Sequence, residues 1–171
     1  MKKAIALVVG LFIMCSFASF STFAEESDTV AKIGDQAFAS LQDAVDSITD
    51  NTTATTIVLQ KNTEGDGVKV PSGKNIIFDF NGCTYTINNN TVGSAGTEAN
   101  GFQLLKGSTI VMQNGSLKHG GSESLKMMIQ NYSNLTLKNM MVDGVAQGDN
   151  QARSLIHISE VCRSRSGQKS A

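Results

Sequence analysis

The feature that most constrains this sequence is a short pattern that occurs three times in its middle. Each occurrence places apolar residues two apart, then an Asn, then a second short apolar run. The three stretches are Lys74–Thr86, Ser108–Leu117 and Ser133–Val142. Alternation with a period of two predicts β-strands with one buried face. The recurrence predicts a stack of similar units.

The Asn residues of this pattern mark equivalent turns. Asn81, Asn114 and Asn139 are spaced 33 and 25 residues apart. An irregular repeat of this length, made of three short strands each, is typical of a coiled parallel β solenoid rather than a sandwich. In such a stack a buried Asn can bond to the Asn above and below, which satisfies amides that burial would otherwise penalise. We therefore predict that these three residues form a structural Asn ladder.

The first 24 residues have the composition of a secretory signal peptide. Lys2 and Lys3 form a basic start, residues 4–20 are apolar, and Ala24 ends a stretch that fits a cleavage site. A membrane anchor is the alternative, but the apolar run is short and no basic stop follows it. We expect a secreted or cell-surface protein with no membrane insertion after signal cleavage.

Residues 154–171 do not continue the pattern. The stretch Ser154–Glu160, SLIHISE, resembles the translation of a transposon adapter used in sequencing libraries, and the Arg- and Ser-rich remainder fits no repeat. We expect a non-native read-through tail, in which case the natural protein is longer and this chain is its N-terminal piece. The alternative is that Leu155, Ile156 and Ile158 begin another strand.

Charge and cysteine content exclude some classes of partner. Residues 25–153 contain nine Lys and Arg against fourteen Asp and Glu, and no basic patch. This composition argues against nucleic acid and anionic membrane surfaces as partners. Cys15 lies in the signal region and Cys162 in the tail, so Cys83 has no partner for an internal disulfide. We expect it to be a small buried residue.

Residues 25–50 are expected to form a hairpin and a helix. Val30–Ile33 and Gln36–Ala39 flank a Gly-Asp pair, which predicts two short antiparallel strands. The stretch Ser40–Ile48 begins with a Ser that an Asp follows three residues later, a variant of the capping box, and its apolar residues have helical spacing. Residues 51–153 would then hold the repeating strands.

Three stretches carry a resemblance to a known family: GDQAFASLQDAVDSI, TTIVLQK and VPSGKNIIFDFNGCTYTI. They resemble the N-terminal region of secreted bacterial right-handed parallel β-helix proteins of the pectate-lyase-like superfamily. The resemblance implies an all-β fold, a right-handed parallel β-helix of three to four turns, with a short N-terminal capping helix over the open end of the core. It implies little about function, because lyases, hydrolases, adhesins and inert stalks share this fold.

No motif for catalysis, for a cofactor or for a metal is found, so we predict none of these sites. Asp79 is the one acidic residue inside a strong strand, but it alternates with Phe78 and Phe80 and should face solvent. Asp143 lies four residues past its Asn and should not stack over Asp79. His119 has no second His or Cys near it, which argues against zinc.

Ligand contact is expected from loops, because loops on a rigid scaffold often carry function. The two candidate loops are polar insertions at Asn88–Asn100 and His119–Ser124. Tyr85 and Tyr132 either stack on sugar rings or simply pack.

Two functions are compatible with these observations. The first is a non-catalytic extracellular or cell-surface module that is adhesive, or binds glycan or a host surface protein. The alternative is the N-terminal part of a carbohydrate-active enzyme, a polysaccharide lyase or glycoside hydrolase, whose active site lies on missing turns. A carboxylate cluster on adjacent strands downstream would favour the enzyme, and a cell-wall anchor would favour the module.

Overall fold

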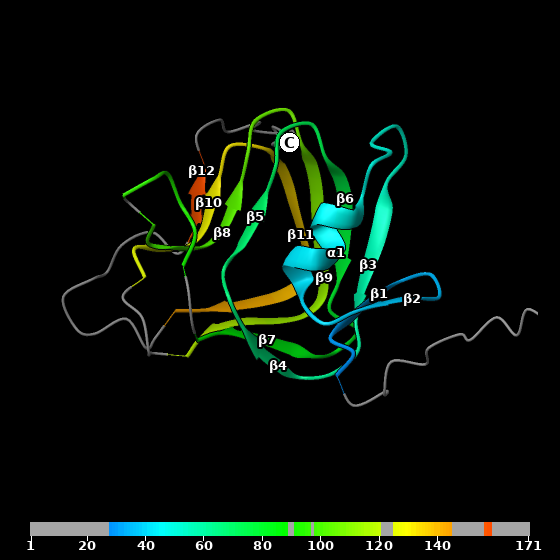
Figure 1. Ribbon diagram of the computed structural model, residues 1–171. Helices are drawn as coiled ribbons and strands as arrows, with labels where there is room; N and C mark the ends of the chain where they lie inside the picture. Colours follow the sequence, from blue (N-terminus) through cyan, green and yellow to red (C-terminus); the bar gives the residue numbers. More distant parts are fainter. Residues whose placement is uncertain (1–27, 89–90, 97, 121–124, 145–155, 159–171) are drawn as a thin grey trace, which may run out of the picture.

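The computed structural model describes residues 28–88, 91–96, 98–120, 125–144 and 156–158 (Figure 1). They form one short helix, α1 (Leu41–Ser47), and twelve strands. The strands are β1 (Ala31–Ile33), β2 (Gln36–Phe38), β3 (Thr55–Leu59), β4 (Thr63–Gly65), β5 (Val68–Val70), β6 (Asn75–Asp79), β7 (Thr84–Ile87), β8 (Asn100–Leu104), β9 (Thr109–His119), β10 (Met127–Asn131), β11 (Asn134–Asp143) and β12 (Ile156–Ile158). The predicted signal peptide lies outside the described residues. No helix in the described part is long and apolar enough to cross a membrane.

The strands form two sheets. The larger sheet has eight strands in the order β2-β1-β3-β6-β9-β7-β4, with β11 also paired to β9. In it, β1 runs antiparallel to β2 and to β3, as the predicted hairpin requires, whereas the other pairs are parallel. The smaller sheet has four parallel strands in the order β12-β10-β8-β5.

Parallel pairing stacks the apolar residues of the repeated pattern into columns. Ile110 of β9 pairs with Ile76 of β6 on one side and with Leu135 of β11 on the other. Phe78 and Met112 are similarly paired, and both are buried. Burial of each such side chain contributes about 1.5–3 kcal/mol. The core therefore lies along these columns, as the alternating pattern predicts.

The prediction of a right-handed parallel β-helix is wrong. The structure has two sheets, one mixed and one parallel, instead of a coil of three short strands per turn. The sequence predicts one short strand before and another after each of Asn114 and Asn139. In the structure each such pair is one continuous strand, β9 through Asn114 and β11 through Asn139. The hairpin adds antiparallel strands to the larger sheet. Alternation reports which face of a strand is buried, and it does not encode where one sheet ends and the next begins.

Helix α1 begins and ends where the sequence predicts, and specific contacts fix both ends. At its start, the Ser40 hydroxyl accepts a hydrogen bond from the backbone N–H of Asp43 (3.0 Å). At its end, the Lys74 ammonium group donates to the carbonyl of Ile48. A cation at this position also interacts favourably with the negative end of the helix dipole.

A side chain of α1 also covers the outer edge of the smaller sheet. The Gln42 side chain accepts a bond from the backbone N–H of Lys69 in β5 (2.8 Å) and donates one to the Lys69 carbonyl (3.1 Å). These are the two bonds that a neighbouring strand would make. The helix therefore protects an edge that could otherwise pair with another chain.

The short strand β12 lies inside the segment that the sequence assigns to a read-through tail. Ile156–Ile158 pair in parallel with Ile129–Asn131 of β10. This is the strand that the alternative for this segment expects. The origin of residues 154–171 stays a prediction, and the rest of the segment lies outside the described residues.

Candidate functional site

The three predicted ladder residues share a backbone conformation rather than a buried environment. Asn81, Asn114 and Asn139 all have positive φ, of 52°, 60° and 50°. Asn tolerates this left-handed region better than other residues with a Cβ. All three side chains are exposed, so the expectation of burial is wrong. They therefore mark equivalent points at which the backbone leaves the extended conformation, which we call corners.

The amide of Asn114 bonds to a carboxylate rather than to another Asn. Its Nδ2 lies 3.2 Å and 3.4 Å from the two carboxylate oxygens of Asp79. Asp79 also accepts bonds from the Gln113 side chain (2.8 Å) and from the backbone N–H of Asn81 (2.9 Å). Partial burial acts to raise the pKa of the Asp79 carboxyl, but these hydrogen bonds outweigh it and hold the pKa below its usual value. Asp79 therefore organises a corner, a role that sequence reasoning missed.

The corner at Asn81 contains two more residues than the strand beside it. Asp79 pairs with Gln113 and Thr84 pairs with Ser116, so residues 80–83 lie opposite Asn114 and Gly115 alone. An ideal Cβ on Gly115 would lie 2.4 Å from Phe80 Cβ and 2.5 Å from the Cys83 carbonyl oxygen. Gly115 is therefore the residue over which the longer corner closes.

A concave site lies elsewhere, between the start of α1 and strand β4. We call it the Tyr85 groove. It consists of an inner pocket of about 250 Å³ and an open outer pocket of about 430 Å³, which share four lining residues. The inner pocket is lined by Val30, Ala39, Ser40, Leu41, Gln42, Thr63, Glu64, Gly65, Asp66, Gly67 and Tyr85. The outer pocket adds Asp28, Lys61 and Asn62.

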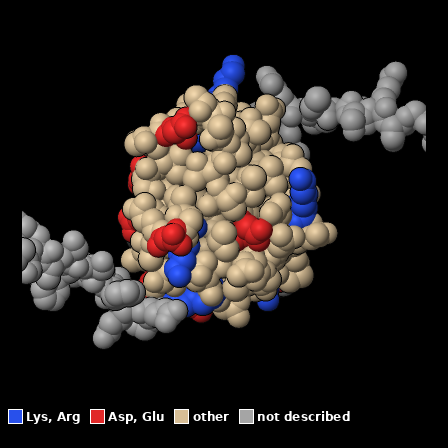
Figure 2. All heavy atoms as spheres, turned by 90° about the vertical axis from the view of Figure 1, so that its right-hand side faces the viewer, with Lys and Arg blue, Asp and Glu red and all other residues tan. Residues whose placement is uncertain are grey.

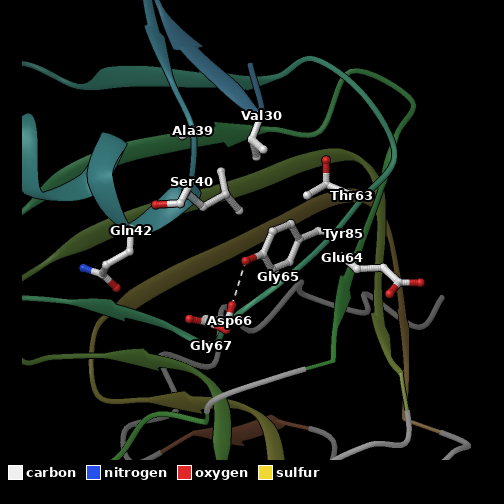
Figure 3. Close-up of a pocket in the computed structure, with 11 residues that line it drawn as sticks. Val30, Ala39, Ser40, Gln42, Thr63, Glu64, Gly65, Asp66, Gly67 and Tyr85 are labelled. Atoms are coloured by element: carbon white, nitrogen blue, oxygen red, sulfur yellow. Dashed lines mark hydrogen bonds between the residues drawn. The ribbon is translucent and has the colours of Figure 1, made fainter. Parts of the chain in front are cut away.

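Tyr85 lies at the centre of the inner pocket (Figure 3). Its hydroxyl donates a hydrogen bond to the backbone carbonyl of Asp66 (2.7 Å). Burial, and to a smaller extent the charge of Asp66, raises the pKa of the Tyr85 phenol well above its usual value. A Cβ on Gly65 would lie 2.4 Å from the Tyr85 hydroxyl oxygen. Glycine at this position is thus what lets the ring pack over β4.

Several polar groups of the groove are held in place by bonds within the protein. Thr63 Oγ1 donates to the Lys61 carbonyl (3.1 Å), and Asn62 Oδ1 accepts from the backbone N–H of Thr84 (2.8 Å). Glu64 Oε2 accepts from the Asn88 side chain (2.8 Å). Each of these groups keeps hydrogen-bonding capacity that these bonds do not use. Fixed polar groups around a cavity are typical of a binding site.

The sequence-based candidates for ligand contact are only partly in this groove. Tyr85 lines it, but is 3% exposed, whereas Tyr132 lies outside the groove and is 40% exposed. Parts of both candidate loops lie outside the described residues, and the described parts do not line the groove. The groove is formed by segments far apart in sequence, so no local sequence motif predicts it.

Bonding between stacked amides occurs in the other sheet. Gln103 of β8 pairs in register with Gln130 of β10, and its Nε2 donates to Gln130 Oε1 (2.8 Å). Asn100 Nδ2 lies 3.3 Å from the same oxygen and 3.0 Å from the Val92 carbonyl. A sequence signal existed, because each Gln directly follows a buried apolar residue of an equivalent strand, Phe102 or Ile129.

Within the described ranges, no three His, Cys, Asp or Glu side chains lie close enough to hold a metal ion. No family model matches this chain, and neither a curated protein nor a solved structure matches it significantly. The resemblance seen in the sequence therefore stays a prediction.

Proposed function

We propose that this chain is a non-catalytic extracellular or cell-surface module that binds carbohydrate through the Tyr85 groove. The observation that carries this proposal is the convergence of fixed hydroxyl, amide and carboxylate groups on a cavity beside an aromatic ring. Sugar hydroxyls both donate and accept hydrogen bonds, and these groups supply both functions. The predicted signal peptide, residues 1–24, supports an extracellular setting.

The size of the groove supports a short stretch of sugar rather than a large ligand. Ligand pockets usually measure about 300–1,000 Å³, and the inner pocket alone, at about 250 Å³, is slightly smaller. One ring in the inner pocket, with its neighbour in the open outer pocket, would use both. Because the lining groups are already ordered, little conformational entropy would be lost on binding.

The distribution of charge supports a neutral ligand. Three carboxylates, of Asp28, Glu64 and Asp66, line the groove beside one ammonium group, that of Lys61. An excess of negative charge disfavours uronic acids and phosphates. Figure 2 shows one face of the molecule, on which basic and acidic side chains are few and interspersed rather than gathered by sign.

A glycan screen followed by calorimetry on the full chain tests the proposal. Asp66→Asn and Thr63→Val remove a charge and a hydroxyl at nearly constant volume, and each should weaken affinity about tenfold, equivalent to about 1.4 kcal/mol. Asp50→Asn, an exposed carboxylate outside the groove, is the matched control and should bind as the parent does. Absence of saturable binding, or equal binding by all variants, would reject the groove. Release of sugar products would favour the carbohydrate-active enzyme instead.

A further inference from the structure

The strand β11 forms an outer edge of the larger sheet that is unlike the other outer strands. Among the described strands it pairs with β9 alone, through nine of its ten residues; Asn139 is the exception. The outer strands β2, β4, β5 and β12 have three residues each. Long outer strands present rows of N–H and C=O groups that can pair with another chain. Among the described outer strands, β11 therefore offers the longest row of backbone groups for pairing with another chain.

Apolar side chains accompany this edge. Leu137 is 37% exposed and Met141 is 52% exposed, and they are two of the three large apolar side chains that the described surface exposes. Leu135, Met140 and Val142 of the same strand pack against the core but are only partly buried. Within the part of the chain that the structure describes, the core side of β11 is thus only partly covered.

The pattern of β11 is symmetric about its own midpoint. Strand β11 changes direction along its length (Figure 1), and within it Asn139 has a left-handed φ of 50°. Leu135 before this corner and Met140 and Val142 after it pack against the core, and Leu137 lies on the same side by its register with Met112. Lys138 and Asn139 are exposed between them. Before the corner, Leu135 and Leu137 pair with the buried Ile110 and Met112 of β9.

We infer that β11 is the surface through which two copies of this chain pair, strand against strand and antiparallel. A two-fold axis through the corner places Leu135 opposite Val142 of the second copy, and Leu137 opposite Met140. Every cross-strand pair on the core side then joins two apolar residues, and the two-fold symmetry makes each pair occur twice. On the outer side Lys138 lies opposite Asn139, Thr136 opposite Met141 and Asn134 opposite Asp143, so no like charges are directly opposed.

The alternative partner for the edge of β11 is the part of the same chain that follows β12. Strand β12 lies on β10 with Ile156 opposite Ile129. The same offset would bring residues 161–170 opposite β11. Those residues would place Cys162, Ser164, Gly167 and Lys169 against the four core-facing apolar side chains, and Arg165 against Lys138. This pairing is chemically poor, whereas a second β11 matches the pattern.

Mass measurement on the full chain, by light scattering and sedimentation, tests the inference. The mass should double as concentration rises. Leu137→Asp places a charge on the core side and should raise the dimer dissociation constant about tenfold or more. Met141→Asp places the same charge on the outer side of the same strand and should leave the dimer intact. A monomer at all concentrations, or equal effects of the two substitutions, would overturn the inference.

Cross-linking provides a second measurement that does not depend on a buried substitution. In the double variant Thr136→Cys/Met141→Cys the new thiols lie opposite each other across the two-fold axis, about 4.5–5.5 Å apart at Cα, which is within disulfide range. Oxidation should then give a covalent dimer. The control Thr136→Cys/Lys138→Cys has no thiol opposite another and should match the parent chain. Equal cross-linking of both would contradict the register. A chain that dimerises only after residues 159–171 are removed would show that the tail covers β11, which also overturns the inference.

Discussion

The Gln42 side chain exchanges two hydrogen bonds with the backbone of Lys69, one in each direction, at 2.8 Å and 3.1 Å. A single residue of the helix thus supplies the donor and the acceptor that a strand would supply to the outer edge of β5. This contact links the only described helix to the smaller sheet. Removing it therefore tests whether the Gln42 side chain protects the edge of β5.

Replacing Gln42 with Ala should remove both bonds and expose the Lys69 backbone. The free energy of unfolding should fall by about 0.5–1.5 kcal/mol per bond lost, and the Lys69 amide should exchange faster with solvent. Gln42→Glu keeps the acceptor for the Lys69 N–H and should preserve the protection of that amide. If Lys69 exchanges equally slowly in Gln42→Ala, the contact does not protect the edge.

Asp79 should make stability depend on pH in the acid range. Its carboxyl has a lowered pKa in the folded state, so the folded form binds its proton less readily than the unfolded form. Its contribution is therefore full above the unfolded value, about 3.9, and is lost as the pH falls through the lower folded value. Asp79→Asn should flatten the acid limb of the denaturation profile and speed exchange of the Asn81 amide. An unchanged acid limb would mean that the hydrogen bonds to this carboxylate contribute nothing.

Gly115 should not tolerate a side chain. An Ala Cβ would lie 2.4 Å from Phe80 Cβ and 2.5 Å from the Cys83 carbonyl oxygen, so the corner at residues 80–83 would have to move. Overpacking of this kind typically costs about 1–3 kcal/mol, which thermal or denaturant unfolding would measure. Ser116→Ala, one residue further along β9, should change stability by less than about 0.5 kcal/mol. Equal stability of both variants would refute the close approach.

Tyr85→Phe should remove the hydrogen bond to the Asp66 carbonyl and lower the free energy of unfolding by about 0.5–1.5 kcal/mol. It should also change the alkaline response. The phenol has a raised pKa in the folded state, so its contribution is full below the unfolded value of about 10 and is lost as the pH rises above it. The variant should lose stability less steeply above that pH. Tyr132→Phe, on an exposed ring, is the control, and parallel alkaline profiles for all three proteins would contradict the burial of Tyr85.

Local patterns predicted the local structure of this protein. The hairpin around Gly34, the helix after Ser40 and the buried faces of β6 and β9 are all present, because short-range alternation, turn residues and capping determine them. The Asn residues do mark equivalent positions, but the buried ladder that the pattern predicts for them is wrong. Their common property is a left-handed backbone, which a sequence does not distinguish from a hydrogen-bonded ladder.

The division into sheets and the groove could not be predicted in the same way. Whether Gln113 and Ser116 belong to one strand or two depends on the backbone at Asn114, through which β9 continues although Asn114 itself has no register partner. The groove forms because Tyr85 lies beside Gly65 and the start of α1, which are distant from it in sequence. Contacts between residues so far apart in sequence depend on the strand register over the whole sheet, and a few local contacts do not determine that register.

The unequal corner at residues 80–83 has a consequence for how a chain of this kind can change length. Two extra residues are accommodated there, while the pairs Asp79–Gln113 and Thr84–Ser116 on either side stay in register. Insertions and deletions at such corners would therefore leave the stacked strands undisturbed, as for other surface connections. In descendants of this sequence, length differences should accumulate beside the left-handed Asn residues. A peptide grafted between Asn81 and Gly82 should be displayed to solvent, because both residues are exposed.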